Sequence, residues 1–323
     1  MGRILILTDG KAGHENQSKA FARALGCEFD LVEVHFKSKF HKALSYLLDR
    51  VGIRRLGLLE GLEKLDPASG SYTAVLGTGS GTFYAAKAMA KKLGVKCGVV
   101  LYPRGYDIKS FDCVLAPAFD RPKSAANVIE IPANLVANDE AFYAKGIEDF
   151  KVHYGKCSNG RMFECSNAVA VIVGGPNKCS TMTPEWMKSK LDSIFAPSTK
   201  HQALGTKPQF WVTTSRRTPP AVEAVVDSYP WDYKLLYSKD HFNPIPAFVK
   251  LAKRLYVTAE STGMLSESCT FGTAEVVALD NLNPGPHKFR RFVEDLRTGG
   301  YVDGNRKVDL SAQFARAKTL MGL

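Results

Sequence analysis

The sequence lacks the cysteine spacing of a metal or redox centre. Its seven cysteines are scattered over 323 residues, and no two of them form a C-x-x-C pair. Structural zinc sites and thiol redox motifs need such close pairs, and an odd number of cysteines cannot all be joined in disulfides. We therefore expect free thiols in a reducing, cytoplasmic setting, with no metal and no cofactor.

Long apolar runs are missing as well. No stretch approaches the roughly 18 apolar residues that a membrane-spanning helix needs. The N-terminal MGRILILTDG turns polar after five apolar-rich positions and has no small-residue cleavage site, so we expect a buried first strand there and no signal peptide. We expect a cytoplasmic protein, with attachment to the inner face of the membrane as an open alternative.

The motifs of nucleic-acid binding are absent although the chain is basic. The formal charge of +11 and the pI near 9.2 favour an anionic partner. There is no zinc-finger spacing, no aromatic-basic RNP motif and no long basic tail. We therefore expect no nucleic acid, and a phosphorylated metabolite or an anionic membrane surface remains as the partner.

What the sequence does contain is a strand, loop and helix pattern that occurs in two successive series. At 323 residues the chain exceeds the size at which one core usually stops growing. Continuous apolar strands separated by amphipathic helices indicate parallel sheets covered on both faces. We predict an α/β protein of two Rossmann-like domains whose parallel sheets face a cleft.

The boundaries follow from where the pattern stops and restarts. Strands are predicted at 3–8, 27–34, 72–77, 95–102 and 111–117, and then at 168–175, 209–215, 233–238, 254–260 and 275–280. Between about 138 and 166 the chain is polar and weakly periodic, so we place the hinge there. The expected domains are 1–150 and 151–305, followed by a helix within 306–323 that could return to the first domain. Thr183, Pro184 and Glu185 mark one helix start.

The first candidate site is DGKAGHENQS, residues 9–18, directly after the first strand. Loops at the carboxyl ends of parallel strands line the crevice in which open α/β sheets bind ligands. Asp9 and His14 are candidate general bases, because a hydroxyl nucleophile must lose its proton. A hydrogen-bonding histidine in a capped turn is the alternative. The other candidate ligand contacts in this loop are Gly10, Lys11, Gly13, Asn16 and Gln17.

The second candidate is the loop GTGSGT, residues 77–82, between a strand and a helix. Glycines and hydroxyls at a helix N-terminus can bind an anionic or polyhydroxylated group. A tight turn capped by Thr82 explains the loop as well, and the lysine-serine pair of a Walker motif is missing. The candidate contacts are Gly77, Thr78, Gly79 and Ser80.

Three further loops follow strands of the second series and would share one edge of a parallel sheet. They are GGPNKCS at 174–180, TTSRRT at 213–218 and TAESTGMLSES at 258–268. Arg216 and Arg217 offer always-charged, bidentate partners for a diphosphate, with solvated surface arginines as the alternative. The other candidates in the first two loops are Gly174, Gly175, Asn177 and Ser215.

The third of these loops opens a helix. Ser261 or Thr262 would cap it, which leaves the N–H groups of Gly263 and Met264 free for a phosphate. Glu267 follows about one turn inside the helix, where a carboxylate can accept hydrogen bonds from two ribose hydroxyls. An ordinary exposed glutamate is the alternative. Ser266 completes the candidate set.

A basic segment also stands out. From Lys37 to Lys64 the chain holds seven Lys/Arg against three acids, interleaved with leucines and aromatic residues. Such an amphipathic surface can rest on anionic lipid headgroups. A pair of sheet-covering helices with a solvated basic face is the alternative.

The motifs DGKAGHENQS, GTGSGT, VIVGGPNK, VTTSRRTPP and TAESTGMLSES, in this order, resemble those of the mitochondrial-fission "elongated mitochondria" family. Bacterial members of that family are labelled predicted nucleoside-diphosphate-sugar epimerases. The resemblance spans nearly the whole chain. The family in turn is similar to the glycosyltransferase-B superfamily, which includes lipid-linked N-acetylglucosamine transferases and the non-hydrolysing N-acetylglucosamine 2-epimerase.

The resemblance implies a glycosyltransferase-B fold with a nucleotide-sugar donor held mainly by the C-terminal domain. Glu267 would bind the ribose, and the loops at Gly174, Ser215 and Ser261 would surround the diphosphate and base. The N-terminal domain, with its candidates in the two glycine loops, would hold an acceptor such as a lipid-linked sugar. Donor binding in the superfamily usually needs no metal, in keeping with the missing D-x-D motif.

The leading functional hypothesis is an inverting sugar transfer. An acceptor hydroxyl, deprotonated by Asp9 or His14, would attack the anomeric carbon while Arg216, Arg217 and helix N-termini stabilise the departing nucleoside diphosphate. One alternative is a nucleotide-sugar epimerase on the same fold. The other is a non-catalytic adaptor that recruits a partner to a membrane, as the role of the plant proteins in organelle division suggests.

Overall fold

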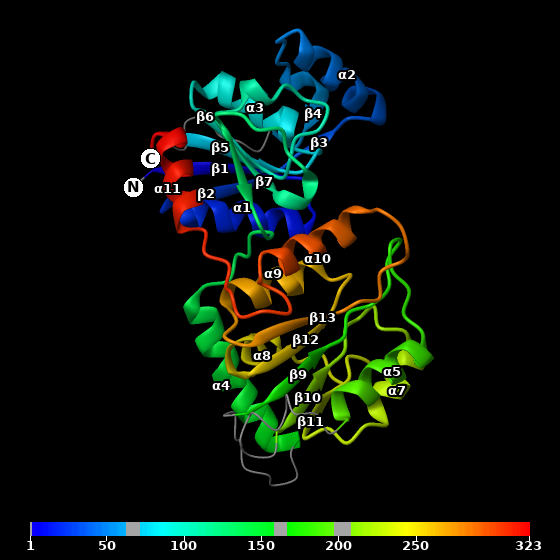
Figure 1. Ribbon diagram of the computed structural model, residues 1–323. Helices are drawn as coiled ribbons and strands as arrows, with labels where there is room; N and C mark the ends of the chain where they lie inside the picture. The colour runs from blue at the N-terminus through cyan, green and yellow to red at the C-terminus, as the bar shows by residue number, and fades with distance from the viewer. Residues whose placement is uncertain (1, 63–71, 158–166, 197–207) are drawn as a thin grey trace. The chain divides into compact units, whose positions relative to one another are not determined.

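Two compact units make up the chain in the computed structural model, which describes residues 2–62, 72–157, 167–196 and 208–323. Unit 1 comprises Met1–Ala137 and Asp309–Leu323, and unit 2 comprises Asn138–Val308. Each unit contains a parallel sheet with helices on its faces (Figure 1). The predicted α/β class with two Rossmann-like domains is therefore confirmed.

Unit 1 is built on a six-stranded sheet of order β2-β1-β5-β6-β7-β8 in which all neighbours are parallel. Its strands are β1 (Arg3–Thr8), β2 (Glu28–Glu33), β5 (Tyr72–Thr78), β6 (Lys96–Val100), β7 (Cys113–Pro117) and β8 (Val128–Ile131). The short strands β3 (His35–Phe36) and β4 (Leu59–Glu60) pair separately and antiparallel. Strand β1 is buried from Ile4 onward, as a strand covered on both faces requires.

The helices of unit 1 cover both faces of this sheet. They are α1 (Ala12–Leu25), α2 (Lys39–Arg50), α3 (Phe83–Leu93) and α11 (Ser311–Met321), with 3-10 turns η1 (Leu56–Leu58), η3 (Ile108–Ser110) and η4 (Ala118–Asp120). Helix α3 packs on one face with Leu5, Leu7 and Val75, whereas α1 and α11 contact each other on the opposite face (Figure 1). The terminal helix α11 also contacts β7 and β8, so it is part of unit 1.

Unit 2 is built on a five-stranded parallel sheet of order β11-β10-β9-β12-β13. Its strands are β9 (Val169–Ile172), β10 (Phe210–Thr213), β11 (Tyr233–Leu235), β12 (Arg254–Thr258) and β13 (Glu275–Leu279). The helices are α4 (Glu140–Cys157), α5 (Pro184–Phe195), α7 (Pro220–Asp227), α8 (Ile245–Leu251), α9 (Thr262–Phe271) and α10 (Lys288–Thr298). Helices α5 and α7 pack on one face of the sheet, while Phe150 of α4 and Phe248 of α8 pack against Trp211 of β10.

The start of unit 2 differs from the sequence expectation. The stretch in which we placed a polar hinge contains α4, and the division of the chain falls before this helix and not at residue 150. The buried face of α4 consists of widely spaced aromatic residues, Tyr143, Phe150 and Tyr154. Gly146 lies between them, where an added Cβ would be 2.5 Å from Pro246. Because only these few apolar positions mark the buried face, the apolar periodicity of α4 is weak in the sequence.

Smaller expectations can be compared in the same way. Helix α5 begins where predicted, with Pro184 in its first turn and Thr183 Oγ1 accepting a hydrogen bond from Trp186 N at 3.2 Å. The cysteines that the structure describes are free thiols: Cys27, Cys97, Cys113, Cys179 and Cys269. Within the described ranges, no helix has the length and apolar character to cross a membrane.

Candidate functional site

Each parallel sheet has a topological switch point, a strand whose two neighbours are reached by connections that run to opposite sides of it. In unit 1, β2 lies on one side of β1 and β5 on the other, and in unit 2, β10 and β12 flank β9 in the same way. The loops after two such neighbouring strands diverge and leave a crevice that commonly binds ligands in open α/β sheets. The predicted loops DGKAGH and GTGSGT occupy this position in unit 1, and GGPNK and TAEST occupy it in unit 2.

Asp9 and His14 form a hydrogen-bonded pair at the switch point of unit 1. His14 Nδ1 lies 3.0 Å from Asp9 Oδ1, and Lys11 Nζ donates to Asp9 Oδ2 at 2.5 Å. The side chain of Asp9 is 6% exposed and that of His14 24%. Burial by itself raises the pKa of Asp9, but the hydrogen bonds from Lys11 and His14 outweigh it and hold the pKa below its usual value. Asp9 is therefore a carboxylate at neutral pH.

The ionised Asp9 determines which nitrogen of His14 carries the proton. A carboxylate only accepts hydrogen bonds, so a neutral His14 donates from Nδ1 to Asp9 and keeps the lone pair on Nε2. The same arrangement of carboxylate and imidazole orients the general base of the hydrolase triads. The pair can thus take a proton from a hydroxyl presented to Nε2.

The GTGSGT loop packs directly on this pair because two of its glycines have no side chain there. A Cβ at Gly79 would lie 2.4 Å from His14 Cε1, and a Cβ at Gly81 would lie 2.8 Å from Asp9 Cβ. Gly79 also has a φ of +83°, a conformation that favours glycine. The two sequence-predicted loops are therefore brought together at one place.

Side-chain hydrogen bonds hold the two loops in this position. Ser18 Oγ and Thr78 Oγ1 lie 2.6 Å apart and join α1 to the end of β5. Ser80 Oγ accepts a hydrogen bond from Lys42 Nζ of α2 at 3.0 Å. Thr82 occupies the N-cap position of α3, but its hydroxyl donates to Gly79 O at 3.2 Å and does not cap the helix as predicted.

The remaining residues predicted in unit 1 have other surroundings. Gly10 has a φ of +74°, and an added Cβ would lie 2.6 Å from Glu33 Oε1. Gln17 is buried, where its Nε2 donates to Gly13 O at 3.4 Å and its Oε1 has no partner among the described residues. Asn16 is exposed. Gly77 lies within β5, where an added Cβ would be 2.7 Å from a threonine hydroxyl, so its role is packing.

Glu260 organises the switch point of unit 2, and sequence reasoning missed it. It is 2% exposed, and its Oε1 accepts hydrogen bonds from Gly175 N at 2.8 Å and Thr258 Oγ1 at 3.0 Å. Its Oε2 accepts from Asn281 Nδ2 at 2.7 Å. An added Cβ at Gly174 would lie 2.0 Å from Glu260 Oε1. The available signal was a glutamate two residues after the end of β12, at the carboxyl edge of the sheet, since burying a carboxylate requires several donors.

The loops after β9 and β10 are joined by Thr218. Its Oγ1 donates to Gly174 O at 2.6 Å and accepts from Ser215 N at 2.9 Å. Arg216 and Arg217, which follow Ser215, are exposed, and neither side chain has a partner in the part of the chain that the structure describes. The two predicted arginines thus stand free at the carboxyl edge of the sheet, next to a rigid turn.

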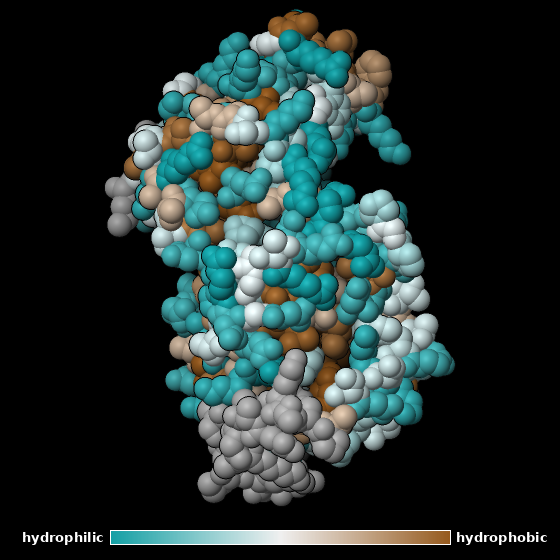
Figure 2. Space-filling model, viewed as in Figure 1, coloured by the Kyte–Doolittle hydropathy of each residue, from teal (hydrophilic) through white to brown (hydrophobic). Residues whose placement is uncertain are grey.

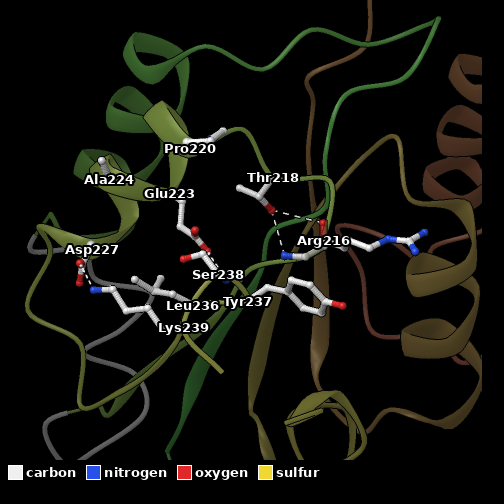
Figure 3. A pocket seen from close by; sticks show the side chains of 11 residues that line it. Arg216, Thr218, Pro220, Glu223, Ala224, Asp227, Leu236, Tyr237, Ser238 and Lys239 are labelled. Atoms are coloured by element: carbon white, nitrogen blue, oxygen red, sulfur yellow. Dashed lines mark hydrogen bonds and ion pairs between the residues drawn. The ribbon is translucent and has the colours of Figure 1, made fainter. Parts of the chain in front are cut away.

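A cavity of ≈ 480 Å³ lies beside this turn. Figure 3 shows Arg216 at one end of it and helix α7 and the segment Leu236–Lys239 along its sides. Glu223 in the wall is buried and accepts hydrogen bonds from Thr214 Oγ1 at 2.6 Å and Ser238 N at 3.4 Å. Burial raises the pKa of Glu223, but these hydrogen bonds outweigh it and lower the pKa, so the wall carries a carboxylate.

The N-terminus of α9 is open, as predicted. Ser261 is its N-cap residue but makes no side-chain capping bond, and Gly263 is exposed in the first turn together with the half-buried Thr262 and Met264. Ser266 differs from the prediction. It is 0% exposed and its hydroxyl donates to Thr262 O at 2.7 Å, so it is satisfied within the helix.

Glu267 is half-buried, in contrast to the alternative that it is an ordinary exposed residue of the helix. Its Oε1 accepts hydrogen bonds from Asn138 Nδ2 and Tyr143 Oη, each at 2.9 Å, whereas Oε2 has no partner among the described residues. Burial raises the pKa of Glu267 although both hydrogen bonds act to lower it. The carboxylate is therefore held through one oxygen and open at the other.

Two further observations complete the comparison with the predicted site. Asn177 Oδ1 accepts a hydrogen bond from Cys179 N at 2.8 Å, so its amide oxygen is used within its own turn. Across the described segments, no group of three or more His, Cys, Asp or Glu side chains is placed to hold a metal ion.

Two Rossmann-like units, each with a parallel sheet and glycine-containing loops at its switch point, are the architecture of the glycosyltransferase-B fold. The chain also matches the family described as "Mitochondrial fission ELM1" over residues 12–315, and it belongs to that family. Comparison with curated protein sequences gave no match.

Similar solved structures cover nearly all of the chain. One is the UDP-GlcNAc 2-epimerase from Neisseria meningitidis bound to UDP-GlcNAc, which is 10% identical with a TM-score of 0.51 over 99% of this chain and 100% of that one. Another is the glycosyltransferase SnogD from Streptomyces nogalater, which is 13% identical with a TM-score of 0.45 over 99% of this chain and 94% of that one. At 10% identity, the likeness to the epimerase shows the fold and no more.

Proposed function

We propose that the protein is a metal-independent glycosyltransferase that binds a nucleotide sugar and transfers its sugar to a lipid-linked or cell-envelope saccharide. The observation that carries this proposal is the Asp9 and His14 pair, held at 3.0 Å at the switch point of a Rossmann-like sheet under a glycine loop.

In this proposal the nucleotide sugar binds unit 2. Arg216 and Arg217 are unpaired cations of the described chain and suit a diphosphate, and the uncapped first turn of α9 supplies N–H donors for it. Glu267 presents its open Oε2 to the ribose hydroxyls while Asn138 and Tyr143 hold Oε1. The ≈ 480 Å³ cavity beside Arg216 offers room for part of the donor.

Unit 1 activates the acceptor. His14 Nε2 takes the proton of an acceptor hydroxyl, and Asp9 stabilises the imidazolium that forms. The acceptor oxygen then bonds to the anomeric carbon as the bond from that carbon to the diphosphate oxygen breaks, and the arginines stabilise the charge on the leaving diphosphate. We further propose a cytoplasmic protein that acts at the membrane surface, where a lipid-linked acceptor would be presented.

Thermal-shift measurements against a panel of nucleotide sugars test the donor site. The stabilising compound should lose its effect in Arg216→Ala/Arg217→Ala and keep it in Asn16→Ala, an exposed control in unit 1. A panel without any stabilising compound would contradict the proposal. Once a donor is known, His14→Ala should lower transfer by about 10²–10⁴-fold without changing the donor-induced shift.

Two alternatives have support of their own. The fold likeness to a UDP-GlcNAc 2-epimerase favours a nucleotide-sugar epimerase, which would convert its substrate with no acceptor present. Membership of a family described by mitochondrial fission favours a non-catalytic adaptor, which would bind no nucleotide sugar. Product analysis in the absence of acceptor separates the first from sugar transfer, and the thermal-shift panel separates the second from both.

A further inference from the structure

Helix α2 buries two polar side chains next to the partly buried Leu44, Tyr46 and Leu48, and it leaves other apolar side chains exposed on its outer face. Ser45 and Asp49 are 0% and 1% exposed, whereas Phe40, Leu47 and Val51 at its other face are 70%, 60% and 62% exposed. Four of the eight large apolar side chains exposed in the described part of the chain lie between residues 40 and 53, where Ile53 is the fourth. Figure 2 shows apolar and hydrophilic side chains together over α2, at the top of the view. Phe40, Leu47, Val51 and Ile53 form the α2 face discussed below.

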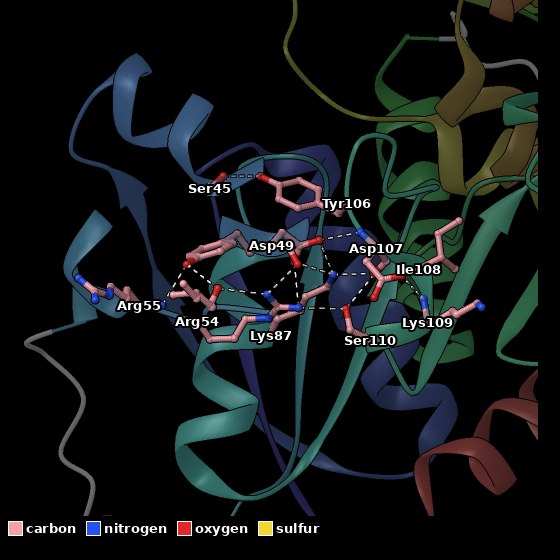
Figure 4. A network of polar contacts seen from close by, with 12 residues as sticks. Ser45, Asp49, Arg54, Arg55, Lys87, Tyr106, Asp107, Ile108, Lys109 and Ser110 are labelled. Carbon is pink, nitrogen blue, oxygen red and sulfur yellow. Dashed lines mark hydrogen bonds and ion pairs between the residues drawn. The ribbon is translucent and has the colours of Figure 1, made fainter. Parts of the chain in front are cut away.

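A buried polar network holds α2 in this orientation (Figure 4). Asp49 accepts hydrogen bonds from Lys87 Nζ at 2.9 Å and from Asp107 N at 2.6 Å, and it pairs with Arg54 at 3.1 Å. Ser45 Oγ lies 2.9 Å from Tyr106 Oη. If the helix rotated to bury its exposed apolar side chains, Asp49 would leave Lys87, and the buried Lys87 would lose its anion. The outward position of the α2 face is therefore built into the fold.

The exposed charges along this segment of the chain have one sign. Between residues 37 and 59 the only acidic residue is Asp49, and it is buried. Lys37, Lys39, Arg50 and Arg55 are exposed. Apolar side chains at helical spacing, flanked by cations without exposed acids between them, match a bilayer surface that presents anionic headgroups over hydrocarbon.

We propose that the α2 face docks the protein on an anionic lipid bilayer. Phe40, Leu47 and Val51 enter the headgroup region while the neighbouring cations contact lipid phosphates. The hydrogen bond from Lys42 of α2 to Ser80 links this helix to the loop over His14, so docking would place the unit 1 site close to the bilayer. Docking of the α2 face does not depend on catalysis. Only the idea that the bilayer presents a lipid-linked acceptor rests on the proposed function.

Co-sedimentation of the full chain with two kinds of vesicle tests this proposal. Vesicles of phosphatidylcholine alone should bind weakly, and equimolar phosphatidylcholine and phosphatidylglycerol should bind well, with affinity falling as salt is raised. Replacing the three apolar residues, in F40S/L47S/V51S, should weaken binding to the anionic vesicles by more than about tenfold. K39E/R50E should weaken it as well and reduce its salt dependence.

The matched control is V152S on α4, because Val152 is 63% exposed outside the α2 face. This variant should bind as the unmodified chain does. The proposal is overturned if the unmodified chain binds neither vesicle, if it binds both equally, or if F40S/L47S/V51S binds normally. A dimer in solution that the triple variant loses, with no vesicle binding, would show that a second copy covers the face and would also overturn the proposal.

The nucleotide-sugar thermal shift of F40S/L47S/V51S separates this proposal from the proposed function. An unchanged shift shows that the variant is folded and that only docking is lost. If the unmodified chain binds vesicles but no nucleotide sugar changes its melting temperature, the docking proposal holds and the proposed transferase function is contradicted.

Discussion

Replacing Asp49 by Asn should destabilise unit 1 strongly. The Asp49 carboxylate is fully buried together with Lys87 at 1% and Arg54 at 8% side-chain exposure. The substitution keeps the shape of the side chain but removes its charge, so two buried cations lose their shared anion. One carboxylate oxygen also becomes an NH2 group, which cannot accept a hydrogen bond from the donor that faces it.

The expected loss of unfolding free energy is about 3–5 kcal/mol, the range measured when one partner of a buried ion pair is removed. Hydrogen bonds to charged groups contribute about 1.5–3 kcal/mol each, and Asp49 accepts one from Lys87 and one from Asp107 N. Burial lowers the pKa of Lys87, and the charge of Asp49 acts to raise it. Without Asp49 the Lys87 pKa falls further, so the deficit should shrink as the pH is raised above neutrality and Lys87 loses its proton.

Hydrogen exchange read by mass spectrometry is the suitable assay. The three tryptophans, Trp186, Trp211 and Trp231, all lie in unit 2, so tryptophan fluorescence during urea unfolding follows the other unit. Amides of β5 and α3 should exchange faster in D49N, with a much smaller change in the fluorescence transition. Lys96→Ala is the matched control in unit 1, because its ion pair with Asp112 is 51% and 31% exposed and should contribute less than about 1 kcal/mol.

If D49N lost as little unfolding free energy as the Lys96→Ala control, the reasoning would be refuted, because Lys87 and Arg54 would then not depend on Asp49 for their stabilisation. A deficit that does not change between neutral and alkaline pH would show that Lys87 is not the group left uncompensated.

Three further predictions concern the candidate site. His14→Ala should lower transfer by about 10²–10⁴-fold at constant donor affinity, as kinetics with saturating donor would show, and equal activity would exclude His14 as the base. Gly79→Ala should displace the His14 ring and impair activity, because its Cβ would lie 2.4 Å from that ring, whereas a Cβ at Gly57 meets open space and Gly57→Ala should leave activity unchanged. Glu267→Gln should weaken nucleotide binding in calorimetry yet raise the melting temperature at neutral pH. The pKa of Glu267 is raised from its ordinary value of 4.5, so the ionised form destabilises the fold at higher pH, and the gain should vanish as the pH falls below that value.

Apolar periodicity made the two α/β units predictable, since a strand covered on both faces must be apolar throughout. It also located the loops, because glycine and polar residues follow each strand at the sheet edge. Apolar periodicity did not reveal α4, because the buried face of this helix consists of only three widely spaced aromatic residues.

The sequence alone determined the fold class, the positions of the candidate loops and the basic character of residues 37–64, because each depends on local composition and order. The tertiary structure decided how these pieces act. It paired His14 with Asp9, made Glu260 as well as Glu267 a hydrogen-bonded carboxylate of unit 2, and left Phe40 and Leu47 of α2 exposed. These outcomes depend on contacts between residues far apart in the chain, and burial and hydrogen-bond partners at such distances are not encoded in any local pattern.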